Sequence, residues 1–331
     1  MMKRLFTVFA LCLLLLTSRG AAALTADKYT AKSAIVMERT SGRVLFALNE
    51  RQKLPMASTT KIVTALTVIE NCDLSQKVTV PKEACGVEGS SVYLKEGEVL
   101  TVEQLLYGLM LRSGNDCAVA LAVHCGGSAE NFCRLMKETA QKYGCKDSSF
   151  RNPHGLPAEG HYTTAWDLAK ITCAALDNQV FAKIVSSRRA AFENRSFVNK
   201  NKLLFSFEGC DGVKTGYTKK AGRCLVASAT RQGMQLVAVA LNCAPMYEEC
   251  ARMLENAFAK YSLKTVLPAN KLCGAVYRNG KPTYYYCTQP FRYPLAQGEK
   301  PTVKVTLQED VQRAEVFLEG KKVYSAPLQA R

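Results

Sequence analysis

The chain has 331 residues, of which 48% are hydrophobic and 22% are charged, and its formal net charge is +16. This length fits two domains, and no stretch beyond the opening segment is apolar for long enough to cross a bilayer, which excludes a multi-span membrane protein. The chain also has no basic helical pattern with interleaved aromatic residues, so we expect no nucleic-acid partner.

The opening segment has the three regions of a secretory signal. Lys3 and Arg4 precede an apolar run over residues 5–16, and three alanines at 21–23 follow. We therefore predict a signal peptide over residues 1–23 and an exported protein located at the cell wall or the outer face of the cytoplasmic membrane. An uncleaved signal could instead anchor the chain.

Removal of this segment takes away Lys3, Arg4 and Arg19, so the net charge falls from +16 to +13. The mature chain would remain strongly basic. This charge suits anionic cell-wall polymers or a membrane surface as partners, and it is equally explained by a need for solubility.

A β-hairpin is predicted near the start of the mature chain. Residues 34–40 and 42–48 alternate between apolar and polar types on either side of a Ser41-Gly42 turn. This alternation is typical of two antiparallel strands joined by a short turn.

The next segment places a serine and a lysine at the start of a helix. After the proline-containing stretch 54–57, apolar residues at 62, 65, 66 and 69 repeat with the period of a helix buried on one side. Ser58 should lie in its first turn, and Lys61 one turn later on the same face, within reach of the Ser58 hydroxyl. A desolvated lysine loses its proton more easily, so this pair has the chemistry of a nucleophile and its base. Taken alone, the pair is also explained by an N-cap serine followed by a solvated lysine.

A second group of polar residues lies between two helical patterns, at 101–111 and 116–124. The connection Ser113-Gly114-Asn115 is too short for anything but a tight turn, and two buried helices would hold it rigidly. By itself the turn is explained by ordinary turn chemistry. Beside the first motif, it offers a second hydroxyl and an amide.

The third group belongs to a sheet. Residues 209–218 contain Lys214-Thr215-Gly216, and two more strand patterns follow at 223–230 and 234–241 with short connections, so the three strands should be antiparallel. Gly216 in an edge strand permits close approach of a substrate backbone. Residues 248–261 then give a final helix. A site built from a helix start, an interhelical turn and a sheet edge must lie in the cleft between them.

The composition changes after Tyr261. Residues from about 263 are rich in Val, Tyr and Thr, with an Asn279-Gly280 turn and alternating segments at 303–307 and 315–318. We therefore predict a small all-β domain over 263–331 after a catalytic domain over 24–262. The β domain is short enough to be marginal alone, which favours docking to its neighbour.

Cysteine is abundant but offers no metal site. Fourteen cysteines occur, and thirteen remain once Cys12 leaves with the signal. No Cys-x-x-Cys pair exists, so we predict neither a metal nor another cofactor. Cys273 and Cys287 are equidistant from Gly280 and are expected to face each other across the predicted hairpin.

Other catalytic schemes are less complete. The chain has no Gly-x-Ser-x-Gly motif and no His-Glu-x-x-His motif, which argues against a Ser-His-Asp hydrolase of the common α/β kind and a zinc peptidase. His124, His154 and His161 are the only histidines. His154, between a proline and a glycine, is interpreted as a structural loop residue.

The three motifs together resemble the low-molecular-mass penicillin-binding proteins, which are serine-type D-alanyl-D-alanine carboxypeptidases of cell-wall metabolism. The resemblance runs from about residue 32 to 260 and includes Pro55-Met56-Ala57, the run from Asn152 to Pro157, and the run from Tyr162 to Asp167. It implies an α+β fold of the β-lactamase/transpeptidase type: an antiparallel sheet flanked by helices, with a helical subdomain.

The resemblance also implies a role for each motif residue. Ser58 would be acylated, Lys61 would take its proton, and Ser113 would relay a proton to the leaving amine. Asn115 would bind the substrate amide, and Lys214, Thr215 and Gly216 would bind the terminal carboxylate and line the edge. The backbone amides of Ser58 and Tyr217 would form the oxyanion hole. Many relatives also have an arginine after the last strand, and the stretch from Asn242 to Tyr247 has none.

The implied reaction removes the terminal D-alanine of peptidoglycan stem peptides, and β-lactam antibiotics such as penicillin would acylate the same serine. A D,D-endopeptidase or a β-lactamase of the same fold remains an alternative, although we find no Glu-x-x-Leu-Asn run after Asn115. A catalytically weak peptidoglycan-binding protein is the alternative outside enzymes.

Overall fold

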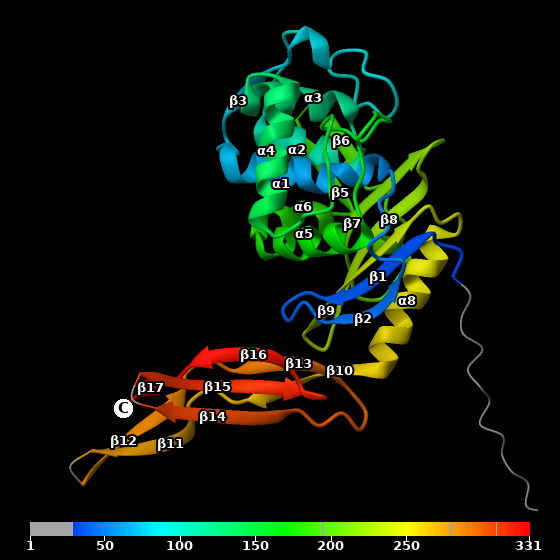
Figure 1. Ribbon diagram of the computed structural model, residues 1–331. Helices are drawn as coiled ribbons and strands as arrows, with labels where there is room; N and C mark the ends of the chain where they lie inside the picture. The colour runs from blue at the N-terminus through cyan, green and yellow to red at the C-terminus, as the bar shows by residue number, and fades with distance from the viewer. Residues whose placement is uncertain (1–28, 194, 279, 309) are drawn as a thin grey trace, which may run out of the picture.

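The computed structural model describes residues 29–331 except 194, 279 and 309, so the predicted signal peptide lies outside the described residues. A five-stranded antiparallel sheet forms the centre of the larger part (Figure 1). Its order is β2-β1-β9-β8-β7, with β1 at Ser33–Glu38, β2 at Val44–Leu48, β7 at Cys210–Thr218, β8 at Gly222–Arg231 and β9 at Met234–Leu241. The predicted hairpin and the three later strands are thus confirmed, and the two ends of this part pair through β1 and β9.

Both faces of this sheet are covered, which explains why β1 and β9 are apolar along their length. One face packs on helix α8 (Met246–Lys260), and residues such as Leu225 and Ala238 belong to that apolar cluster. The other face packs on α5 (Ala165–Asp177) and the helices beyond it, through residues such as Ile35 and Val239. Strand β7 stays at the edge.

The helical region is inserted between β2 and β7, as predicted. Thr101 is the N-cap of α2 and forms a capping box with Gln104, and Gly127, whose φ is 73°, is the C-cap of α3, which is buried over most of its length. The region contains η1 (Ala57–Thr60), α1 (Lys61–Asn71), β3 (Lys77–Thr79), η2 (Lys82–Ala84), β4 (Val99–Thr101), α2 (Val102–Leu111), α3 (Asn115–Gly126), α4 (Ala129–Lys142), α5, α6 (Gln179–Ser186), β5 (Arg189–Phe192), β6 (Arg195–Val198) and α7 (Leu203–Ser206).

In the described residues after α8, all regular elements are strands, as the sequence predicted. A separate apolar cluster that includes Leu267, Phe291 and Val316 forms their core. The strands are β10 (Tyr261–Leu267), β11 (Lys271–Arg278), β12 (Lys281–Cys287), β13 (Phe291–Ala296), β14 (Thr302–Gln308), β15 (Val311–Leu318), β16 (Lys321–Pro327) and β17 (Gln329–Ala330). Among the described residues, no helix has the length and apolar character needed to span a membrane.

Arg43 connects this C-terminal part to the central sheet. Its guanidinium forms an ion pair with Glu299 at 2.6 Å and donates to the carbonyl of Pro294. The same guanidinium lies 5.1 Å and 5.2 Å from the ring centroids of Tyr261 and Tyr293. These contacts follow the turn of the first hairpin, so the β1–β2 pair holds the C-terminal strands beside the sheet (Figure 1).

The expectation for Cys273 and Cys287 is wrong. Strands β11 and β12 do form the predicted hairpin, but Cys287 pairs with Lys271 because a bulge between Leu272 and Gly274 shifts the register at Cys273. All thirteen cysteines from Cys72 to Cys287 are free thiols.

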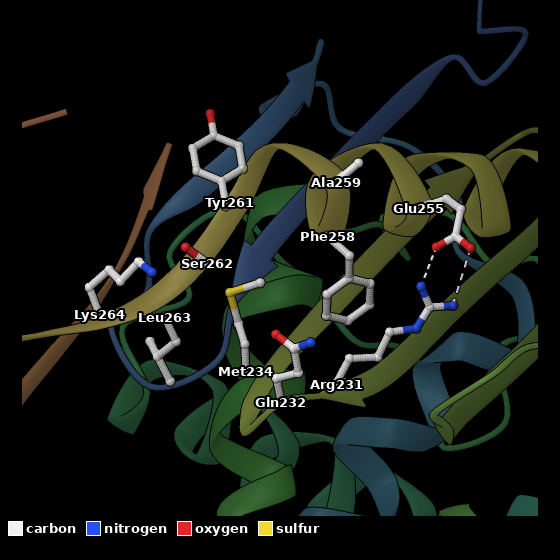
Figure 2. A pocket seen from close by; sticks show the side chains of 10 residues that line it. All are labelled: Arg231, Gln232, Met234, Glu255, Phe258, Ala259, Tyr261, Ser262, Leu263 and Lys264. Carbon is white, nitrogen blue, oxygen red and sulfur yellow. Dashed lines mark hydrogen bonds and ion pairs between the residues drawn. The ribbon is translucent and has the colours of Figure 1, made fainter. Parts of the chain in front are cut away.

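A hollow of about 400 Å³ lies where the end of α8 and the start of β10 meet the β8–β9 turn (Figure 2). Arg231 and Lys264 are the cations of its lining, and Figure 2 shows the Arg231 guanidinium directed at Glu255, with which it forms an ion pair. The same guanidinium lies between the rings of Phe207 and Phe258, at 4.8 Å and 4.9 Å. The charge of Arg231 is thus neutralised by Glu255, and its guanidinium is in contact with two aromatic rings. We therefore interpret this hollow as a structural junction.

Candidate active site

The three predicted motifs meet in one hollow of about 360 Å³ at the free edge of β7. Its lining includes the hydroxyls of Ser58, Ser113 and Thr215. The complete lining is Ser58, Ser90, Ser113, Lys200, Thr215, Gly216, Tyr217, Arg223, Met246 and Tyr247. Lys61, Asn115 and Lys214 lie behind this surface, each less than 4% exposed. Residues from η1, the α2–α3 turn and β7 are therefore brought together as the sequence predicted.

Ser58 and Lys61 lie at the junction of η1 and α1. Ser58 belongs to the 3₁₀ turn, and Lys61 is the first residue of the α-helix, so the predicted spacing of one turn holds. The Lys61 ammonium nitrogen, Nζ, lies 3.0 Å from Ser58 Oγ. Ala57, just before the serine, has a φ of 49°, a left-handed conformation that is unfavourable for a residue with a side chain. The strained entry turns the Ser58 hydroxyl into the cleft.

Lys61 is fully buried and bound by neutral groups. Besides Ser58, its Nζ donates to Asn115 Oδ1 at 2.7 Å and to the carbonyl of His154 at 2.6 Å. Burial, and secondly the charge of Lys214, hold the pKa of Lys61 well below its ordinary value. The lowered pKa favours a neutral amine beside the Ser58 hydroxyl, and a neutral amine can accept a proton.

The segment 152–157 completes the pocket around Lys61, a role that the sequence reasoning missed. The Asn152 side chain accepts from Gly155 N at 2.7 Å and donates to Leu156 O at 2.9 Å, which shapes the loop so that the His154 carbonyl faces Lys61. Gly155 has a φ of 93°, and a Cβ there would lie 1.9 Å from Ala57 O. The Asn-Pro-His-Gly run signals a turn, but not which residues the turn contacts.

The His154 imidazole is not placed to act as the base. Its Nδ1 accepts a hydrogen bond from Leu156 N at 3.2 Å. Burial, followed by the charge of Lys61, lowers the pKa of His154 to about 3, so the ring is neutral and engaged within its own loop. The structural interpretation of His154 from the sequence agrees with this geometry.

The α2–α3 turn presents Ser113 to the cleft. Ser113 has a φ of 64° and is 4% exposed. Gly114 fits because a Cβ there would lie 2.7 Å from Asp116 Oδ1 and 3.0 Å from Cys117 Sγ. This crowding explains why the middle position of the motif is a glycine in this chain.

Asn115 connects two parts of the site. Its Oδ1 accepts from Lys61, its Nδ2 donates to Glu88 O at 2.6 Å, and its backbone nitrogen donates to Ser90 O at 2.7 Å. The sequence predicts that this amide binds the substrate. In the free protein it positions Lys61 and the 88–90 segment.

The strand edge lies directly beside Ser58. A Cβ on Gly216 would lie 3.0 Å from Ser58 N and 3.2 Å from Met56 O, so glycine favours this close approach of the strand to the serine. Lys214 is 1% exposed, and its Nζ donates to Thr215 O at 2.9 Å. Burial, followed by the charge of Lys200, lowers the pKa of Lys214 to about 7. Tyr217 stands at the mouth with 62% of its surface exposed.

This shifted pKa predicts how Lys214 affects stability. An unfolded chain keeps Lys214 protonated up to its ordinary pKa of 10.5, whereas the folded chain releases the proton near 7. Between these values the unfolded state binds more protons, so the free energy of unfolding rises with pH relative to a Lys214→Met variant. We expect the variant to be more stable by about 5 kcal/mol below pH 7, and the difference to disappear toward pH 10.

Denaturant unfolding of both proteins from pH 6 to 10 measures this difference. The exposed Lys220, in the turn after β7, provides the control: Lys220→Met should show no such pH-dependent difference from wild type. A stability difference for Lys214→Met that stays constant between pH 7 and 10 would contradict the pKa shift.

Comparison with known proteins finds a matching family and several relatives. The family described as D-alanyl-D-alanine carboxypeptidase, Peptidase S11, matches residues 20–244. The chain is 33% identical over 349 residues to D-alanyl-D-alanine carboxypeptidase DacF of Bacillus subtilis, covering 99% of this chain and 88% of that protein. It is 38% identical over 230 residues to DacC of Escherichia coli, covering 65% of this chain and 57% of that protein.

Solved structures share the fold. Penicillin-binding protein 5 from Haemophilus influenzae superposes with a TM-score of 0.80 at 29% identity, covering 92% of this chain and 97% of that one. Penicillin-binding protein 6B from Escherichia coli gives a TM-score of 0.75 at 30% identity, covering 91% and 95%. The predicted fold of the β-lactamase/transpeptidase type is confirmed by these structures and by the sheet order.

Proposed function

This chain belongs to the S11 family of serine D-alanyl-D-alanine carboxypeptidases, and we propose that it carries out that reaction through an acyl-enzyme on Ser58. The observation that carries the assignment is the buried Lys61, whose Nζ lies 3.0 Å from Ser58 Oγ and has no carboxylate among its hydrogen-bond partners in the described residues. Such a lysine serves as a base for the hydroxyl.

Acylation proceeds by attack of Ser58 Oγ on the carbonyl carbon of the penultimate D-alanine, while the hydroxyl proton passes to the neutral Lys61. The carbonyl oxygen of the tetrahedral intermediate becomes negatively charged. The backbone amides of Ser58 and Tyr217 would stabilise this oxygen, and the closeness of Gly216 to Ser58 N supports a hole at this position.

The bond between the carbonyl carbon and the nitrogen of the last D-alanine then breaks. Its nitrogen takes the proton from Lys61, with the Ser113 hydroxyl as the relay, and free D-alanine leaves. In deacylation, water attacks the ester carbon and gives a proton to Lys61. The bond between this carbon and Ser58 Oγ then breaks, Ser58 Oγ takes the proton from Lys61, and the shortened peptide leaves with a new terminal carboxyl group. Asn115 keeps Lys61 in position through both steps.

The substrate lies along the edge of β7 with its terminal carboxylate near Lys214 and Thr215. An extended peptide beside an edge strand gains backbone hydrogen bonds, which suits the tail of a peptidoglycan stem peptide. The carboxylate of penicillin would take the same place, so β-lactams are expected to acylate Ser58 as well.

Export and domain division complete the proposal. Residues 1–23 would direct secretion, residues 24–262 would form the catalytic domain, and residues 263–331 the β domain. The enzyme would act at the cell wall or on the outer face of the cytoplasmic membrane. Its positive charge supports attraction to anionic wall polymers or a membrane surface, screened by salt.

Two measurements on the wild-type protein test this function. A fluorescent penicillin should label the protein covalently, and a diacyl tripeptide ending in D-Ala-D-Ala should release free D-alanine. Labelling without any release of D-alanine would point to a catalytically weak binding protein. Absence of both would contradict the proposal.

A further inference from the structure

Arg223 is an exposed cation at the mouth of the cleft. It lines the hollow together with Thr215 and Tyr217. Its guanidinium carbon lies 5.5 Å from the centroid of the Tyr217 ring, so the ring supports the cation from one side. The contact with Tyr217 therefore holds the Arg223 guanidinium in one place, although the side chain is exposed to solvent.

The register of the sheet places Arg223 and Thr215 on the same face. Arg223 pairs with Tyr217 across β7 and β8, and residues directly opposite each other project from the same face. Thr215, two residues before Tyr217, projects from that face as well. Arg223 is thus the diagonal neighbour of Thr215, at a spacing of about 7 to 8 Å that a long side chain spans.

No carboxylate of the described residues neutralises Arg223, because it takes part in no ion pair or side-chain hydrogen bond among them. The other end of the same strand shows the contrast. Arg231 is bound by Glu255 and covered by two aromatic rings. An arginine left without an anion inside a hydroxyl-lined hollow is prepared to bind one.

Lys214 lies near the place proposed for the terminal carboxylate, but it and the other lysines of the site are buried or already bound within the protein. Lys61 and Lys214 are fully buried, and Lys214 Nζ is already bound to Thr215 O. Lys200 Nζ donates to Ser90 Oγ at 2.9 Å. A guanidinium stays charged at every physiological pH and binds a carboxylate through two parallel N–H groups.

We propose that Arg223 binds the free C-terminal carboxylate of the substrate, together with Thr215, and thereby makes the enzyme an exopeptidase. This inference rests on the proposed function, since it assigns a residue to the recognition of that substrate. A peptide bond continued beyond the last D-alanine would present a neutral amide to Arg223 and would leave the charge without a partner.

The test compares two peptides that differ only at the C-terminus. One ends in D-Ala-D-Ala with a free carboxylate, and the other carries the C-terminal amide. For Arg223→Ala, we expect kcat/KM on the carboxylate peptide to fall about ten- to a hundredfold, and kcat/KM on the amide to stay within about twofold. Arg223→Lys should recover part of the loss, because it restores charge without the paired donors.

Lys220→Ala is the matched control, since it removes a cation of the same hairpin outside the hollow. It should leave the preference between the two peptides unchanged. An equal fall on both peptides for Arg223→Ala, or no fall on the carboxylate peptide, overturns the assignment of Arg223. If the wild type hydrolyses the last peptide bond of neither substrate, releasing no D-alanine from the one and no D-alanine amide from the other, the proposed function itself fails. This result differs from both outcomes for the variant.

Discussion

Replacement of Ser58 by alanine is expected to abolish covalent labelling by penicillin and to lower the rate of D-alanine release by about a millionfold, the scale seen when a serine nucleophile is removed. The variant keeps Lys61, the cleft and the strand edge, but it has no oxygen on which an acyl group can form. Intact-mass measurement after incubation with penicillin gives the result directly. Because Ser58 is the second residue of η1 and lines the cleft, its replacement removes a hydroxyl without opening the apolar core.

The control for this variant is Ser206→Ala, which removes an exposed hydroxyl at the end of α7, outside the cleft. It should carry the full penicillin mass. A complete adduct on Ser58→Ala would show that another residue is the nucleophile.

Replacement of Lys61 by arginine is expected to slow acylation by about a hundred- to ten-thousandfold, the usual contribution of a general base. The variant retains a positive charge at the position, but a guanidinium does not release its proton near neutral pH. The structure supports this expectation, because burial holds the pKa of Lys61 well below its ordinary value and so favours the neutral amine.

The rate of labelling by a fluorescent penicillin measures this effect, and a melting curve shows whether the variant is folded. Lys220→Arg, an equal change at an exposed lysine, should label at the wild-type rate. A folded Lys61→Arg protein that labels at a near-normal rate would exclude Lys61 as the base.

Much of the fold could be predicted because its signals are local. The alternation of apolar and polar residues on both sides of Ser41 and Gly42 predicts the first hairpin. The short connections between the strands after Gly216 require these strands to be antiparallel. The spacing of Ser58 and Lys61 fixes one helical turn whatever the rest of the fold. The motif residues therefore lie at the secondary-structure boundaries that the sequence indicated.

Contacts between distant segments could not be predicted from the same signals. Nothing in the pattern around residue 154 shows that its carbonyl accepts a hydrogen bond from Lys61, 93 residues earlier. The bulge at Cys273 places Cys287 opposite Lys271, and the alternation of apolar and polar residues in the sequence does not show where a bulge occurs. In the sequence, Arg223 has the features of an ordinary strand residue. Only the strand register shows that it lies opposite Tyr217.

The open edge of β7 also bears on how copies of this protein behave toward one another. An edge that accepts a peptide strand offers the same unpaired backbone groups to the β7 strand of a second molecule, a route to aggregation. Lys219 and Lys220, both exposed, follow the strand, and the whole chain has a net charge of +16. Two copies of this basic edge repel each other, so the charge opposes edge-to-edge pairing of β7 strands from different molecules. The same charge attracts an anionic peptide to the edge.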